Sequence, residues 1–164
     1  MSRPLWGESA LKDSVEDAFV RFARSVEPAL RMALTAGHGF DRGLEATNDV
    51  LVYAWKHWDR VSRLDNPAGY LYRVGQRKAR RRRLVPDILA VSPVGRYPWF
   101  EPHLSGALKS LSSRQRQVVV LIEAYEWTFR EVAEFLGVRP SSVQTHHRRA
   151  MERLRLRLGV NIHG

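Results

Sequence analysis

The sequence contains no cysteine, which excludes disulfides, thiolate catalysis and cysteine-based zinc sites. Long apolar runs are also missing. No stretch approaches the roughly 20 residues of a membrane-spanning helix, and the N-terminus lacks the apolar core of a signal peptide. Acidic residues are few, 17 against 27 Lys and Arg, which leaves a net charge of +10. We therefore expect a soluble, cytoplasmic protein with a polyanionic partner.

The chain has 164 residues, of which 44% are hydrophobic. This is enough for a packed core, but the length excludes a large multi-domain enzyme. Apolar residues recur at three- and four-residue spacing, and no strand pattern is present. The sequence therefore predicts an all-α fold.

Proline and glycine divide the chain. Helices are expected over residues 14–34, 44–58 and 67–83, with Gly37 and Gly39 after the first. Residues 84–104 hold four of the eight prolines, which indicates a linker. Further helices are expected from Ser112 and Thr128, because capping boxes start there. We predict two small helical domains, residues 14–83 and 105–158, joined by the linker 84–104.

Residues 128–158 predict a helix-turn-helix. Its first helix should bury Phe129, Val132, Ala133 and Leu136, and Gly137 should close it in a left-handed conformation. The second helix should start at Pro140 or Ser141. Its apolar stripe comprises Val143, His147, Ala150, Leu154 and Leu158.

The opposite face of this second helix is polar, as suits insertion into a DNA major groove. It carries Ser141, Ser142, Gln144, Thr145, His146, Arg148 and Arg149. The alternative is a plain helical hairpin with solvated charges. A metal site is not expected, because the adjacent His146 and His147 point about 100° apart on a helix.

Residues 77–83 carry six cations in seven positions. Such a run is solvated or lies against phosphates, although a localisation signal or a basic arm would have the same composition. Tyr70, Tyr72, Trp55 and Trp58 nearby could stack on unpaired bases. We expect Trp55 in the core, and Tyr72 and the arginines at the surface.

With these motifs, the chain resembles the sigma-70 family of RNA polymerase initiation factors, in particular its extracytoplasmic-function group. The resemblance covers residues 15–83 (region two) and 105–158 (region four). It is strongest in LSSRQRQVVVLIEAYEWTFREVAEFLGVRPSSVQTHHRRAMERLR. Departures lie in the basic helix, where Gln76-Arg77-Lys78-Ala79 and four arginines replace an Arg-Asn-Leu-Ala-like run.

The resemblance implies three interfaces. The −10 element would be held by Tyr72, Arg73, Gln76, Arg77, Arg80 and Arg81. The −35 element would be read by the polar face of the second helix, with Arg114 and Arg116 at the DNA backbone. The polymerase would be bound by Asn48, Asp49, Val52, Tyr53 and Trp55.

The implied partners are promoter DNA and core RNA polymerase, through the clamp helices of its largest subunit and the flap of the second-largest. An anti-sigma factor is a further candidate. No catalytic residue, cofactor, membrane contact or small-molecule substrate is expected, and the protein would lie at the nucleoid.

Two alternative functions remain. One is a free-standing helix-turn-helix regulator, which would dimerise. The other is a recombinase-like nucleic-acid enzyme, for which no suitable carboxylate, serine or metal cluster is evident.

Overall fold

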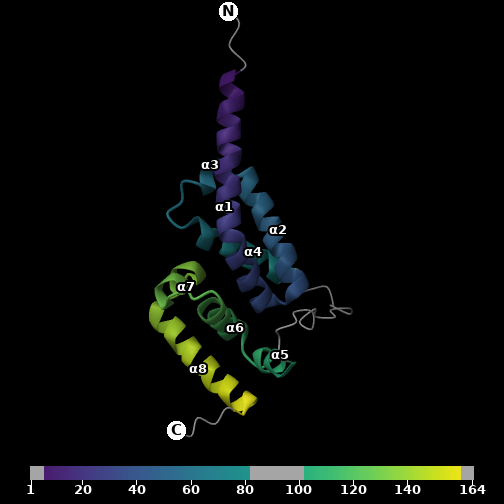
Figure 1. The fold of residues 1–164 in the computed structure, drawn as a ribbon, viewed down its shortest axis with the longest axis vertical. Helices are drawn as coiled ribbons and strands as arrows, with labels where there is room; N and C mark the ends of the chain where they lie inside the picture. The colour runs from purple at the N-terminus through teal and green to yellow at the C-terminus, as the bar shows by residue number, and fades with distance from the viewer. Residues whose placement is uncertain (1–5, 82–101, 160–164) are drawn as a thin grey trace, which may run out of the picture.

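The computed structural model describes residues 6–81 and 102–159, and this part of the chain is helical without any strand (Figure 1). The all-α expectation is therefore confirmed. The N-terminal bundle consists of α1 (Trp6–His38), α2 (Phe40–Lys56), α3 (Trp58–Val61) and α4 (Pro67–Arg81). The C-terminal bundle consists of α5 (Pro102–Lys109), α6 (Ser113–Val119), the π-helical turn η3 (Val120–Ala124), α7 (Phe129–Leu136) and α8 (Pro140–Leu158).

Several boundaries differ from the sequence-based expectation. The first helix begins at Trp6, earlier than expected, and ends at His38, where Gly39 adopts a φ of 90°. The second begins at Phe40 instead of near residue 44, and α5 begins at Pro102, within the expected linker. Arg82, Arg83 and linker residues 84–101 lie outside the described residues.

The N-terminal bundle depends on a close approach of α1 and α2. Gly43 lies against the α1 backbone, where a Cβ atom would come within 2.4 Å of the N and Cα atoms of Thr35. The neighbouring Thr47 is fully buried, and its hydroxyl donates to the Gly43 carbonyl oxygen at 2.7 Å. Only glycine allows this backbone contact, so residue 43 fixes how the two long helices pack.

The C-terminal bundle has the helix ends that its sequence predicts. Ser112 and Thr128 are N-caps of α6 and α7, and both capping boxes are complete. Gly137 ends α7 in the left-handed conformation at φ 68°, and Pro140 occupies the first turn of α8. Between the two caps, η3 continues α6 and buries Leu121. The helix-turn-helix expectation is thus confirmed in its elements.

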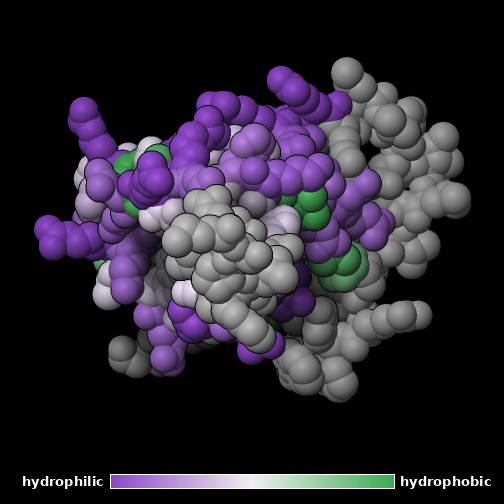
Figure 2. Space-filling model, turned by 90° about the horizontal axis from the view of Figure 1, so that it is seen from above, coloured by the Kyte–Doolittle hydropathy of each residue, from purple (hydrophilic) through white to green (hydrophobic). Residues whose placement is uncertain are grey.

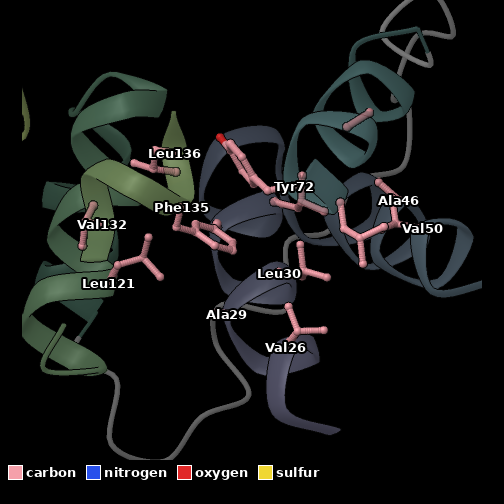
Figure 3. Packing of buried hydrophobic residues seen from close by; sticks show 14 of the residues in the cluster. Val26, Ala29, Leu30, Ala46, Val50, Tyr72, Leu121, Val132, Phe135 and Leu136 are labelled. Carbon is pink, nitrogen blue, oxygen red and sulfur yellow. The ribbon is translucent and has the colours of Figure 1, made fainter. Parts of the chain in front are cut away.

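The two bundles share one hydrophobic cluster (Figure 3). Leu30 of α1 lies between the two groups of side chains, with Val50 of α2 on one side and Phe135 of α7 on the other. A second, smaller cluster around Ala150 and Leu154 holds α8 against α5 and α6. The main cluster therefore joins helices that are separated by the proline-rich segment.

Two expectations about the core are wrong. Trp55 is 42% exposed and contacts Phe19 of α1 with its ring, at a centroid distance of 5.0 Å. Phe129 is 36% exposed because it begins α7 and meets the ring of His147 edge-on. Phe135, which was not expected in the core, takes the buried position on α7 and is 4% exposed.

Candidate nucleic-acid interface

The N-terminal half of α8 presents a polar face. Val143, Ala150 and Leu154 are buried on the side that faces the bundle. Ser141, Gln144, Arg148 and Arg149 are exposed, and Ser142, Thr145 and His146 are half-buried. Helix α8 lies at the outer edge of the C-terminal bundle, away from α1 (Figure 1). The sequence-predicted residues on this helix therefore share one accessible surface, which we call the α8 face.

A group of basic residues joins the α8 face to α6. The pKa of His146 is lowered, mainly by burial and then by the positive charges of Arg114 and Arg149. These three residues therefore lie close enough to influence one another. A positive surface of this kind suits phosphate binding, as predicted for Arg114.

Arg116 has a different environment from Arg114. Its Nε donates to the Ala36 carbonyl oxygen and its Nη1 to that of Leu111, both at 2.8 Å. Burial lowers the pKa of its guanidinium. In this arrangement Arg116 connects α1 to the α5–α6 turn, and most of its donors are directed at protein carbonyls.

His147 lies beneath the α8 face at the edge of the core, as predicted. Its Nε2 is 2.7 Å from Oε1 of Glu123 in η3, and its ring meets that of Phe129. The sequence did not identify Glu123 as its partner. The contact attaches the N-terminal half of α8 to η3, so it positions the polar residues on either side.

Helix α4 exposes its basic side chains. Arg73, Arg77, Arg80 and Arg81 are exposed, and Gln76 is half-buried. The guanidinium of Arg73 reaches the helix-turn-helix, where Nη1 lies 3.2 Å from the position of a Cβ atom at Gly137. The predicted basic surface of α4 is thus present and borders on the C-terminal bundle.

The expected exposure of Tyr72 is wrong, because its exposed fraction is 0%. Its ring stacks on Phe135 of α7, and Figure 3 shows the two side chains pointing toward each other. The hydroxyl accepts hydrogen bonds from Gln76 at 3.1 Å and from Arg114 at 3.4 Å. Burial raises its pKa. Residues predicted for the two promoter elements, Tyr72 and Arg114, therefore contact each other.

The outer face of α2 carries the residues predicted to bind polymerase. Asn48, Val52 and Trp55 are exposed, and Asp49 and Tyr53 are half-buried at the edges. The opposite face contains the buried residues Ala46, Thr47, Val50 and Ala54. The helix therefore presents these five side chains on one side, which we call the α2 outer face.

Sequence reasoning missed a cluster beside this face. The hydroxyls of Tyr53 and Tyr70 are 2.9 Å apart, and the Arg60 guanidinium donates to both. The hydrogen bond to Tyr53 raises the pKa of Tyr70. This cluster ties α2 to α3 and α4. Only the tertiary arrangement brings the three residues together, since the sequence separates Tyr53 and Tyr70 by 17 positions.

One face of the molecule is mostly polar where its residues are described. Viewed from the N-terminal end of α1, hydrophilic side chains cover most of it, with small hydrophobic areas between them (Figure 2). Within residues 6–81 and 102–159, no helix is long and apolar enough to cross a membrane. The same residues contain no cluster of three potential metal ligands.

Comparison with known proteins agrees with this geometry. Residues 104–154 match the family model of sigma-70, region 4. Among curated proteins, no sequence matches the chain significantly. Solved structures that match include the sigma factor RpoE of Bartonella quintana in complex with the anti-sigma factor NepR, at 23% identity and a TM-score of 0.66. The match covers 88% of this chain and 98% of the other.

The family match includes both helices of the helix-turn-helix up to Leu154, and the structural match extends over both bundles. Residues 104–154 thus match region 4 of the sigma-70 family, and the fold is similar to that of a solved sigma factor.

Proposed function

We propose that the chain is a sigma factor of the extracytoplasmic-function type, which binds core RNA polymerase and directs it to promoters. The α8 face would read the −35 element, α4 would hold the −10 element, and the α2 outer face would bind the polymerase clamp helices. The observation that carries this proposal is the α8 face, whose polar side chains are exposed on a helix that Val143, Ala150 and Leu154 anchor in the bundle.

The composition of the α8 face suits base recognition. Ser141, Gln144 and Thr145 are short or amide side chains at the start of the helix, where a recognition helix approaches base edges. Arg148 and Arg149 follow one turn later, and a guanidinium can bind guanine or phosphate with two parallel hydrogen bonds. The same helix would thus supply both specificity and backbone contacts.

Promoter binding requires a rearrangement of the structure described here. Tyr72 is covered by Phe135, and Arg73 lies against the helix-turn-helix at Gly137. We therefore infer that α4 separates from α7 when the −10 element is bound. The bundles would then act as the two domains expected from the sequence, and polymerase would fix their spacing and raise their effective concentration at DNA.

Without polymerase, the affinity of the chain for DNA should accordingly be modest, because each bundle offers a single small DNA-binding surface. An inhibitory protein that favours the closed arrangement is a further expected partner, since the similar RpoE was solved with the anti-sigma factor NepR. The protein would act without catalysis of its own and would lie at the nucleoid with the polymerase.

Run-off transcription with purified core enzyme from the native bacterium tests the proposal. Adding the chain should start defined transcripts on templates from its own genome, and Asp49→Lys on the α2 outer face should abolish the gain. Asp59→Lys, an exposed residue of α3 with the same charge change, is the matched control. No gain on any genomic template, or a dimer that binds promoters tightly without polymerase, would favour a free-standing regulator.

A further inference from the structure

A cleft of about 470 Å³ lies at the junction of the two bundles. Its walls come from the end of α1, the start of α2, the C-terminal part of α4 and the start of α6. The residues that matter for its chemistry are Arg42, Gln76, Arg80, Arg114 and Arg116. We call this space the junction cleft, and it exists only while α6 is docked on the N-terminal bundle.

The junction cleft concentrates positive charge. Four arginines line it, and none of the described residues in its walls is Asp or Glu. Like charges that share a cleft repel one another, and low-dielectric walls strengthen the effect. Closing the two bundles therefore creates a local excess of positive charge that an anion would relieve.

Two of these arginines offer donors to an anion. Arg42 has a buried Nε with no hydrogen-bond partner. Arg80 is exposed in the wall of the cleft, so its guanidinium is accessible to an anion there. Leaving a buried charged donor unsatisfied is costly, whereas guanidinium groups bind phosphate oxygens in pairs. Arg116 is already directed at the Ala36 and Leu111 carbonyls, so it contributes mainly charge.

The size of the cleft distinguishes between anions. Sites for small molecules measure about 300–1,000 Å³, and the junction cleft falls within that range. A single phosphate would engage only part of it, whereas a chain of phosphates could meet Arg42, Arg80 and Arg114 at once. The lining includes Ser113 and Gln117 as neutral polar groups and no large apolar surface for a hydrophobic ligand.

From this geometry we propose that the junction cleft binds a small anion with two or more linked phosphates, either a polyphosphate chain or a nucleoside polyphosphate, and that binding holds the two bundles together. The stabilisation of the closed arrangement follows from the binding, because a ligand that binds only the closed arrangement shifts the population toward it. A sigma factor in this state keeps Tyr72 buried. The site would thus regulate promoter engagement, an aspect that depends on the proposed function, whereas the anion binding itself does not.

Calorimetric titration of the full chain tests the binding. The probes are inorganic phosphate, pyrophosphate, tripolyphosphate and guanosine and adenosine triphosphates, all at matched ionic strength. We expect saturable binding of one ligand per chain, weak for monophosphate and tighter for the linked phosphates. Equal affinity for tripolyphosphate and the nucleotides would identify the phosphate chain as the ligand, and tighter nucleotide binding would identify a nucleoside polyphosphate.

Matched variants locate the site. Arg42→Gln and Arg80→Gln should each weaken binding by about tenfold or more, the effect of losing charge-assisted hydrogen bonds. Arg157→Gln, an exposed residue at the end of α8 with the same charge change, should bind as the wild type does. Arg42→Lys should recover only part of the affinity, because lysine lacks the planar fork. Equal weakening in Arg157→Gln, or non-saturable binding, would overturn the proposal.

A measurement of the distance between the two bundles tests whether the ligand holds them together. Because the chain has no cysteine, dyes can be placed by Asp59→Cys and Arg155→Cys, both exposed and on different bundles. Tripolyphosphate should narrow the distance distribution and raise the melting temperature of the labelled double-cysteine protein, and neither effect should occur when Arg42→Gln is added to it. Arg42→Gln should still support run-off transcription, which separates failure of the site from failure of the proposed function. Unchanged distances at saturating ligand would contradict the closing role.

Discussion

The rings of Tyr72 in α4 and Phe135 in α7 stack with their centroids 5.0 Å apart and their planes inclined by 38°. Trp127 extends the contact, meeting Phe135 edge-on at 5.2 Å. Nearby, Asn66 Nδ2 donates to the Glu134 carbonyl oxygen at 3.0 Å, and Gln117 Nε2 donates to that of Ala33 at 2.8 Å. Aromatic packing and hydrogen bonds thus join the bundles at the same place.

Replacing Phe135 should weaken this joint. We expect Phe135→Ala to lower the free energy of unfolding by about 3–5 kcal/mol, because it leaves a cavity in the main cluster. Tyr72→Phe removes only the hydroxyl and should cost about 1 kcal/mol. Chemical denaturation measures both.

A double-mutant cycle on Tyr72→Ala and Phe135→Ala isolates the ring contact. The coupling should be about 0.5–1.5 kcal/mol, as for other aromatic pairs. Additive effects within error would mean that the rings do not contact each other in solution.

Two glycine substitutions should act in opposite directions. Gly43→Ala should destabilise the protein by about 1–3 kcal/mol, because the new methyl group would meet the α1 backbone. Gly106→Ala, in α5, has open space around the new methyl group and should stabilise by about 0.5–1 kcal/mol through helix propensity. Thermal unfolding of both variants checks the signs, and equal effects would refute the close approach of α1 and α2.

The capping box of α7 should respond to acid. Hydrogen bonds from the backbone and side chain of Thr128 lower the pKa of Glu131 below its ordinary 4.5. Its contribution to stability is therefore complete above pH 4.5 and is lost as the pH falls through the lower folded-state pKa. Glu131→Gln should remove this dependence, so the stability difference from wild type should shrink below pH 4.5. Thr128→Ala should cost about 1 kcal/mol at neutral pH.

His146 should give a second pH effect. It arises from a base whose charged form is disfavoured in the folded protein, whereas for Glu131 the charged form is favoured. Burial and then Arg114 and Arg149 lower its pKa from the ordinary 6.5. The unfolded chain therefore takes up a proton first as the pH falls below 6.5, and stability decreases until the pH is below the folded-state pKa. His146→Gln should flatten this part of the stability profile. An unchanged profile would place His146 in solvent.

The arginines of α8 and α4 should differ in what they contribute to DNA binding. Arg149→Ala should cost about 1–3 kcal/mol and change sequence preference at the −35 element if the guanidinium contacts a base. Arg81→Ala should weaken binding on all promoters alike and reduce the salt slope by about one. Holoenzyme binding to promoter variants over a salt series measures both, and identical profiles would contradict the separate roles.

Local chemistry explains what could be predicted from the sequence. Ser112 and Thr128 were recognised as helix starts because each is followed by its capping partner three residues later, and Gly137 as a helix end because of its place between two apolar patterns. These signals lie within a few residues of one another. Apolar spacing likewise identified the buried stripe Val143, Ala150 and Leu154.

The errors concern contacts between distant segments. Tyr72 was expected at the surface because its neighbours are basic, yet α7, more than 50 residues later, covers it. Trp55 was expected in the core from its helical spacing, but the packing of α1 leaves it partly exposed. The junction cleft was not predicted either, since its arginines come from three helices. Periodicity shows which side of a helix is apolar but not which partner covers it.

The π-helical turn at Val120–Ala124 affects the geometry of the whole C-terminal bundle. Such a turn accommodates one residue more than an α-helical turn would, and each residue rotates an α-helix by about 100°. Removing one residue there would swing Glu123 away from His147 and turn the cap at Thr128 to a different side of the bundle. The orientation of α8 therefore depends on chain length at a position outside the α8 face.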